Sequence, residues 1–130
     1  MAAISSFRDL DVYKISRENA KKIFLVTRNF PDDEKYSLTN QIRRSSRAVC
    51  AMLAEAWARR RYQAAFVNKI NEALGEAMET QSWLDQAADC SYINAKQFQE
   101  MDSAWQRVGA MLNRMMERAE TFCRALNQKG

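Results

Sequence analysis

A chain of 130 residues with three glycines and one proline has little to interrupt regular structure, and its length suits a single domain, residues 1–130. The net charge of +4 permits binding to nucleic acid or another anionic partner without requiring it. Histidine is absent and the three cysteines form no CxxC pair, so we expect no metal site, no cofactor and no disulfide framework.

The composition predicts an all-α protein. Ala, Gln, Glu, Met, Arg and Leu are frequent, and these residues lose least on entering a helix. The N-terminal residues contain no basic segment followed by an apolar run, and no stretch approaches the roughly 18 to 20 apolar residues that cross a bilayer. We therefore expect a cytoplasmic protein with no membrane partner.

The first predicted helix covers about residues 8–30. Ser6 with Asp9 three residues later is a helix start signal. Apolar residues then recur at steps of three and four until Pro31, which pushes the residue before it out of helical geometry. The expected core positions are Tyr13, Ala20, Ile23, Phe24, Thr27 and Phe30.

The second predicted helix, about residues 37–60, carries most of the basic character of the chain. The stretch 36–61 contains six arginines and a single acid, Glu55. The expected core positions are Leu38, Ile42, Val49, Leu53, Ala56 and Trp57. The candidate binding residues are Arg43, Arg44, Arg47, Arg59, Arg60 and Arg61.

The third predicted helix, about residues 63–89, is the acidic counterpart of the second. Its acids are Glu72, Glu76, Glu79, Asp85 and Asp89. The expected core seam is rich in alanine and consists of Phe66, Ile70, Ala73, Ala77, Gln81, Leu84 and Ala88. Trp83 lies off this seam, and we interpret it as an anchor of a subunit interface because tryptophan is favoured at desolvated contacts.

The fourth predicted helix covers residues 94–127, with Asn94 as its cap and Gln97 answering from three residues on. Its apolar residues alternate steps of three and four without a fault, which is typical of a helix packed lengthwise on its neighbours. They are Phe98, Met101, Trp105, Val108, Leu112, Met115, Ala119, Phe122 and Leu126. Four such helices with short connections predict an antiparallel up-down-up-down four-helix bundle.

Several segments carry a family resemblance: FRDLDVYKIS (7–16), FPDDEKYSLTNQIRRSS (30–46), AE (54–55), EALGEAMETQSWL (72–84) and SYI (91–93). Together they resemble the bacterial four-helix-bundle proteins encoded in intervening sequences of 23S ribosomal RNA genes. Relatives of those proteins include accessory proteins of diversity-generating retroelements, which work beside a reverse transcriptase. The resemblance implies the bundle, a ring-shaped homopentamer and a nucleic-acid partner. The sequence departs from the family pattern N-I-A-E-G at Met52 and Ala56.

Two interpretations of the arginines remain open. Arg43 and Arg44 either pair with acids of the third helix, within one bundle or across a subunit boundary, or contact phosphate. Arg59, Arg60 and Arg61 either complement the negative end of the helix dipole or contact phosphate.

No P-loop and no nucleophile–base pair is visible in the sequence, so we expect no catalysis. The function we expect is that of a homo-oligomeric bundle that binds structured RNA or an RNA–DNA hybrid through arginine–phosphate contacts. The alternative is a structural interaction module whose arginines form salt bridges and whose ring recruits another protein, such as a reverse transcriptase.

Overall fold

Long runs of helix-favouring residues with few breakers give an almost entirely helical structure. The computed structural model describes residues 4–127, with side chains described through residue 123, and no strand is present among them. The four main helices are α1 (Asp11–Thr27), α2 (Leu38–Ala58), α3 (Gln63–Asp89) and α4 (Ala95–Glu117). Two 3₁₀ turns, η1 (Phe7–Asp9) and η2 (Asp32–Glu34), precede α1 and α2, and a short helix, α5 (Ala119–Asn127), follows α4.

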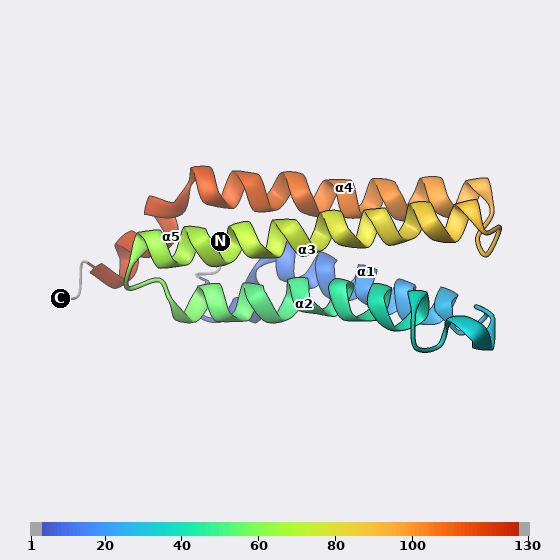
Figure 1. Cartoon of the computed structure of the whole chain (residues 1–130). Helices are drawn as coiled ribbons and strands as arrows, with labels where there is room; N and C mark the ends of the chain where they lie inside the picture. Colours follow the sequence, from blue (N-terminus) through green and yellow to red (C-terminus); the bar gives the residue numbers. More distant parts are fainter. Residues whose placement is uncertain (1–3, 128–130) are drawn as a thin grey trace.

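The four main helices lie side by side in two layers, with α1 and α2 in one layer and α3 and α4 in the other (Figure 1). Packing contacts join α1 to α2, α2 to α3, α3 to α4 and α1 to α4. Each main helix therefore turns one face to the interior and keeps another for solvent or a partner. No helix in residues 4–127 combines the length and the apolar character needed to cross a membrane.

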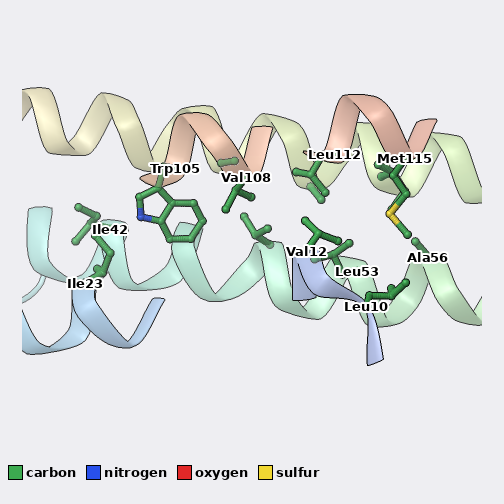
Figure 2. Packing of buried hydrophobic residues seen from close by; sticks show 14 of the residues in the cluster. Leu10, Val12, Ile23, Ile42, Leu53, Ala56, Trp105, Val108, Leu112 and Met115 are labelled. Atoms are coloured by element: carbon green, nitrogen blue, oxygen red, sulfur yellow. The ribbon is translucent and has the colours of Figure 1, made fainter. Parts of the chain in front are cut away.

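The apolar faces of the helices meet in one core between the layers. Figure 2 shows Trp105, Val108 and Leu112 of α4 on the side of α4 that faces Ile42 and Leu53 of α2. None of these five side chains is more than 1% exposed. Burial of a side chain of this size contributes about 1.5–3 kcal/mol to folding. The core thus fixes which faces of α1 and α2 remain outside.

Most of the core positions predicted from helical spacing are buried. The larger apolar exceptions, each only half-buried, are Tyr13, Phe24, Trp57, Phe98, Met101 and Phe122. Leu126, which was also predicted for the core, lies outside the described side chains. Helical spacing therefore identifies the inward faces well, although side chains at the edge of a face stay partly in solvent.

Polar side chains inside the interface of α3 with its neighbours find partners. Gln81 donates from Nε2 to Oδ1 of Asp102 on α4, 3.1 Å away. The hydroxyls of Ser45 on α2 and Thr80 on α3 form a buried hydrogen bond of 2.8 Å. Thr80, which the predicted seam did not contain, is fully buried. These pairs fix the register of α3 against both neighbours, because sliding either helix would leave a buried polar group unsatisfied.

The first helix differs from the prediction at its start. Ser6 and Asp9 do form a capping box, but the element that they cap is the 3₁₀ turn η1. Leu10 then adopts an extended backbone, with φ −67° and ψ 128°, and α1 begins at Asp11. The predicted range 8–30 was also too long at its end, because α1 stops at Thr27 and leaves Phe30 buried in the turn before Pro31.

The predicted continuous helix over 94–127 is wrong, because it consists of two helices. Arg118, with φ −107° and ψ 27°, ends α4, and α5 starts at the next residue. The turn buries Cys123 and places the ring of Phe122 over Phe66 of α3, with 5.8 Å between ring centres. Because α3 begins at Gln63, a straight α4 would carry these side chains past the end of the helix that covers them. The apolar spacing is unbroken since both helices turn the same face inward.

A cluster around Glu34 joins the α1–α2 connection to the α3–α4 connection. Its carboxylate accepts hydrogen bonds from the Ser37 hydroxyl (2.6 Å) and from the Tyr92 hydroxyl (2.8 Å). The Tyr92 ring also contacts Phe30, with 5.3 Å between ring centres. The bond from Ser37, followed by that from Tyr92, holds the pKa of Glu34 below its ordinary value. The bond to Glu34 raises the pKa of Tyr92 to about 12.

Candidate functional site

The six arginines predicted to bind do not form one patch. They occupy three settings: Arg44 faces α3, Arg43 and Arg47 lie beside α1, and Arg59 to Arg61 follow the end of α2. At a rise of about 1.5 Å per residue, the third group lies on the order of 18 Å along the helix direction from Arg47. The three settings differ in what the guanidinium groups already contact.

Arg44 is committed to α3. Its guanidinium pairs with Glu76, at 3.1 Å between Nη2 and Oε1, and with Glu79. The hydrogen bond to Glu76 raises the pKa of Arg44, and the proximity of Glu76 raises the pKa of Glu79. Of the two interpretations of Arg44, pairing within one chain is therefore the observed one. A phosphate would have to displace two carboxylates to bind Arg44 fully.

Arg43 and Arg47 project from α2 toward α1, where both guanidinium groups lie over the Phe24 ring. The central guanidinium carbon is 4.8 Å from the ring centre for Arg43 and 5.6 Å for Arg47. Arg43 also donates from Nε to the Thr27 hydroxyl, 2.8 Å away. Within the part of the chain that the structure describes, neither arginine has an ion pair. The ring therefore orients two charges that no acid neutralises.

The helix α1 supplies further cations to the same place. A surface hollow of about 330 Å³ between α1 and α2 is lined by Tyr13, Arg17, Ala20, Lys21, Phe24, Arg47 and Cys50. Its charged residues are all basic. Burial raises the pKa of the Cys50 thiol to about 11, so this sulfur stays protonated and adds no negative charge near neutral pH. We call this hollow, together with Arg43 beside it, the basic groove.

Sequence reasoning missed Arg17 and Lys21. A signal for them was available, because they follow Tyr13 by four and eight residues and so lie near the edge of α1 that carries Tyr13 and Phe24. What the sequence does not specify is that this edge of α1 meets the edge of α2 with Arg43 and Arg47. That pairing of edges depends on how the helices rotate when the core packs.

The third group surrounds the turn from α2 to α3. Arg60 lies on the Trp57 ring, with its guanidinium carbon 3.5 Å from the ring centre, and donates from Nε to the Trp57 carbonyl, 2.8 Å away. Burial lowers the pKa of Arg60. Arg59 and Arg61 are exposed, and neither has an ion pair among the described residues. This end of α2 thus offers two exposed charges and one that is held against tryptophan.

Trp83 lies on α3 and is half-buried against the core. Its indole Nε1 is buried and has no hydrogen-bond partner within the described chain. A buried indole N–H ordinarily finds an acceptor, so this group is an unsatisfied hydrogen-bond donor among the described residues. Its role as an interface anchor stays a prediction.

Both the sequence and the fold of this chain match known proteins. The model of a family described as "23S rRNA-intervening sequence protein" matches residues 8–114, a range that contains the basic groove and the α2–α3 turn. A similar solved structure is that of a protein of unknown function from the S23 ribosomal protein family of Bacteroides thetaiotaomicron VPI-5482. It is 28% identical with a TM-score of 0.73, and the match covers 82% of this chain and 95% of that chain. None of the curated proteins matches the chain.

Proposed function

The chain belongs to the family of 23S rRNA-intervening sequence proteins, and from that membership we propose that it is a non-catalytic cytoplasmic protein that binds structured RNA or an RNA–DNA hybrid. In this proposal the main helices form an antiparallel up-down-up-down bundle that assembles as a homopentamer. Contacts between basic side chains and phosphates supply the affinity, so the binding carries little base preference.

The observation that carries the proposal is the basic groove. It brings Arg17 and Lys21 of α1 beside Arg43 and Arg47 of α2, and no acid among the described residues lines it. Phe24 holds two guanidinium groups in place before any ligand arrives, which reduces the side-chain entropy lost on binding. Charge-assisted hydrogen bonds from arginine to phosphate are among the stronger contacts that proteins make.

The layout of these charges favours a polymer of phosphates as the ligand. Arg43 and Arg47 are one helical turn apart, and so are Arg17 and Lys21, which places the cations in two short lines along neighbouring helices. Arg59 and Arg61 then form a second contact at the α2–α3 turn. Arg44 contributes least, because Glu76 and Glu79 already neutralise it.

The charge asymmetry of the molecule favours a second candidate, a protein-recruiting ring. The groove on α1 and α2 is basic, whereas α3 carries five acids, of which Glu76 and Glu79 are bound to Arg44. A copy that lays its acidic α3 on the basic groove of the next copy makes a head-to-tail contact, and such contacts close into rings. The groove would then be covered, and the ring would present other surfaces to a protein such as a reverse transcriptase.

The experiment that separates these candidates measures the salt dependence of binding to a labelled RNA duplex and an RNA–DNA hybrid. Each phosphate contact steepens the plot of log affinity against log salt by about 0.9 on B-form DNA, and we expect a comparable effect here. The double variant Arg43→Gln/Arg47→Gln should flatten the slope by the amount that two lost phosphate contacts account for, about 1.8 on the B-form scale. The matched control is Arg107→Gln/Arg114→Gln, which removes two exposed arginines of α4 and should leave the slope near that of the native protein.

Two outcomes would contradict the proposal. If the native protein does not bind either nucleic acid at low salt while light scattering shows an intact oligomer, the protein-recruiting ring is the remaining reading. If the control flattens the slope as much as the groove variant does, binding follows net charge alone and the groove is not the site.

A further inference from the structure

Where the chain passes from α1 to α2, a second hollow of about 210 Å³ adjoins the basic groove through Arg43, which is shared. It is lined by Thr27, Arg28, Phe30, Pro31, Asp32, Lys35, Thr39 and Arg43. Three of these residues are cations and one, Asp32, is an acid. None of the three cations has an ion pair in the described part of the chain.

The Thr39 hydroxyl distinguishes this hollow from an ordinary basic surface. Thr39 is only 7% exposed, and its Oγ1 is buried with no hydrogen-bond partner in the described part of the chain. The neighbouring Thr27 hydroxyl is satisfied, because it donates to the Ile23 carbonyl at 2.8 Å and accepts from Arg43. Burial of an unsatisfied hydroxyl costs stability, and this one lies beside a cluster of cations with its capacity to donate a hydrogen bond unused.

The backbone of α2 adds a third observation. Thr39 is the second residue of this 21-residue helix, and the cap residue Ser37 makes no side-chain hydrogen bond to the helix N-terminus. Glu34 accepts from the N–H of Leu38 at 3.3 Å, but the N–H groups of Thr39 and Asn40 have no partner among the described residues. Free N–H groups at the positive end of a helix dipole attract anions.

From these three features we propose that the hollow binds a single phosphate group. Arg28, Lys35 and Arg43 supply the charge, and the Thr39 hydroxyl donates to a phosphate oxygen. Asp32 opposes the anion and limits its affinity. The phosphate is that of a free phosphate or small phosphoester, or a backbone phosphate of nucleic acid in the adjoining groove. The site needs one phosphate only, so it stands even if the nucleic-acid proposal fails.

The test is thermal unfolding of the full chain in inorganic phosphate against chloride at matched ionic strength. A ligand that binds only the folded state raises the unfolding temperature in a saturable way, and we expect this for phosphate but not for chloride. Thr39→Val keeps the shape of the side chain and removes the hydroxyl. It should weaken phosphate binding by about tenfold, as expected for a lost hydrogen bond to a charged group.

Two further variants test whether the response to phosphate arises at this hollow. Ser16→Ala removes another buried hydroxyl that has no partner, on α1, and should leave the response to phosphate unchanged. Asp32→Asn removes the opposing charge and should strengthen phosphate binding. Without phosphate, Thr39→Val should unfold at the native temperature or above it, because an unsatisfied group has been removed, so failure to fold cannot explain a lost response.

The proposal is overturned if phosphate stabilises the native protein no more than chloride does, or if Thr39→Val keeps the full response. The source of the phosphate follows from a parallel RNA titration. A loss of RNA affinity in Thr39→Val assigns the site to a backbone phosphate. Unchanged RNA binding, or none in the native protein, together with a lost response to inorganic phosphate assigns it to a free phosphate or small phosphoester.

Discussion

At the scale of single residues, Glu34 shows how one carboxylate can hold distant segments together. One carboxylate accepts from Ser37, from the backbone of Leu38 and from Tyr92, which belongs to the connection at the far end of α3. Two loops distant in sequence are therefore joined through one side chain. Its contribution to stability should depend on its charge, because all three donors favour the ionised form.

We predict that Glu34→Gln lowers the free energy of unfolding at pH 7 and lowers it by less at pH 3. The pKa of Glu34 is lowered from 4.5 by these hydrogen bonds, so its contribution is present above the unfolded pKa and lost as the pH falls through the lower folded value. Urea midpoints at the two pH values would measure this. Asp33→Asn, an exposed acid of the same turn, is the control. An equal loss at pH 3 would show that the carboxylate charge is not the cause.

The candidate site shows what residue patterns can and cannot predict. The patterns single out Arg43 and Arg47 and state the pairing of Arg44 with acids of the third helix as one of two options. They do not reveal that Phe24 lies beneath two arginines, because that contact depends on the rotation of α1 against α2. The unpartnered Thr39 hydroxyl is invisible for the same reason.

At the scale of elements, the α4–α5 junction is the clearest case in which local pattern is insufficient. Its apolar spacing continues through Arg118 without a fault, and neither glycine nor proline marks the turn. The range 63–89 predicted for the third helix, by contrast, coincides with α3. Sequence patterns locate the inward faces of helices reliably, but they do not reveal a turn after which the same face still points inward.

We predict that Phe122→Ala detaches α5 while leaving the rest of the fold intact. Phe122 is half-buried and stacks on Phe66, so its truncation should cost about 2 kcal/mol locally. Hydrogen exchange should become fast in the amides of α5 and stay slow in α2 and α3. Thr121→Ala, at the exposed neighbour, should change neither. Simultaneous loss of protection in all helices would mean that α5 is part of the main cooperative unit.

At the scale of the whole molecule, the proposed oligomer requires a contact between copies. The basic groove and the acidic α3 lie in different layers, which suits head-to-tail assembly. Trp83 of α3 carries an N–H that has no acceptor among the described residues. An acceptor from a neighbouring copy would satisfy that N–H.

We therefore predict that Trp83→Ala weakens association of the oligomer by more than about tenfold, as for an interface hot spot. Light scattering over a series of protein concentrations would measure it. Met78→Ala, which truncates an exposed apolar residue of the same helix, is the control. Circular dichroism must show that Trp83→Ala remains folded, since the ring also contacts the core. An unchanged mass in a folded variant would remove Trp83 from the interface.

The three cysteines lie at three depths of the structure, so the rates at which they react with a thiol reagent can report local opening of the bundle. Cys90 is exposed after α3, Cys50 is half-buried between α1 and α2, and Cys123 is a buried residue of α5. A thiol reagent reaches Cys90 directly and reaches Cys50 through the surface hollow, where the raised pKa of this thiol slows labelling. It reaches Cys123 only when α5 lifts away. The rate at which Cys123 is labelled thus records how often α5 leaves the bundle.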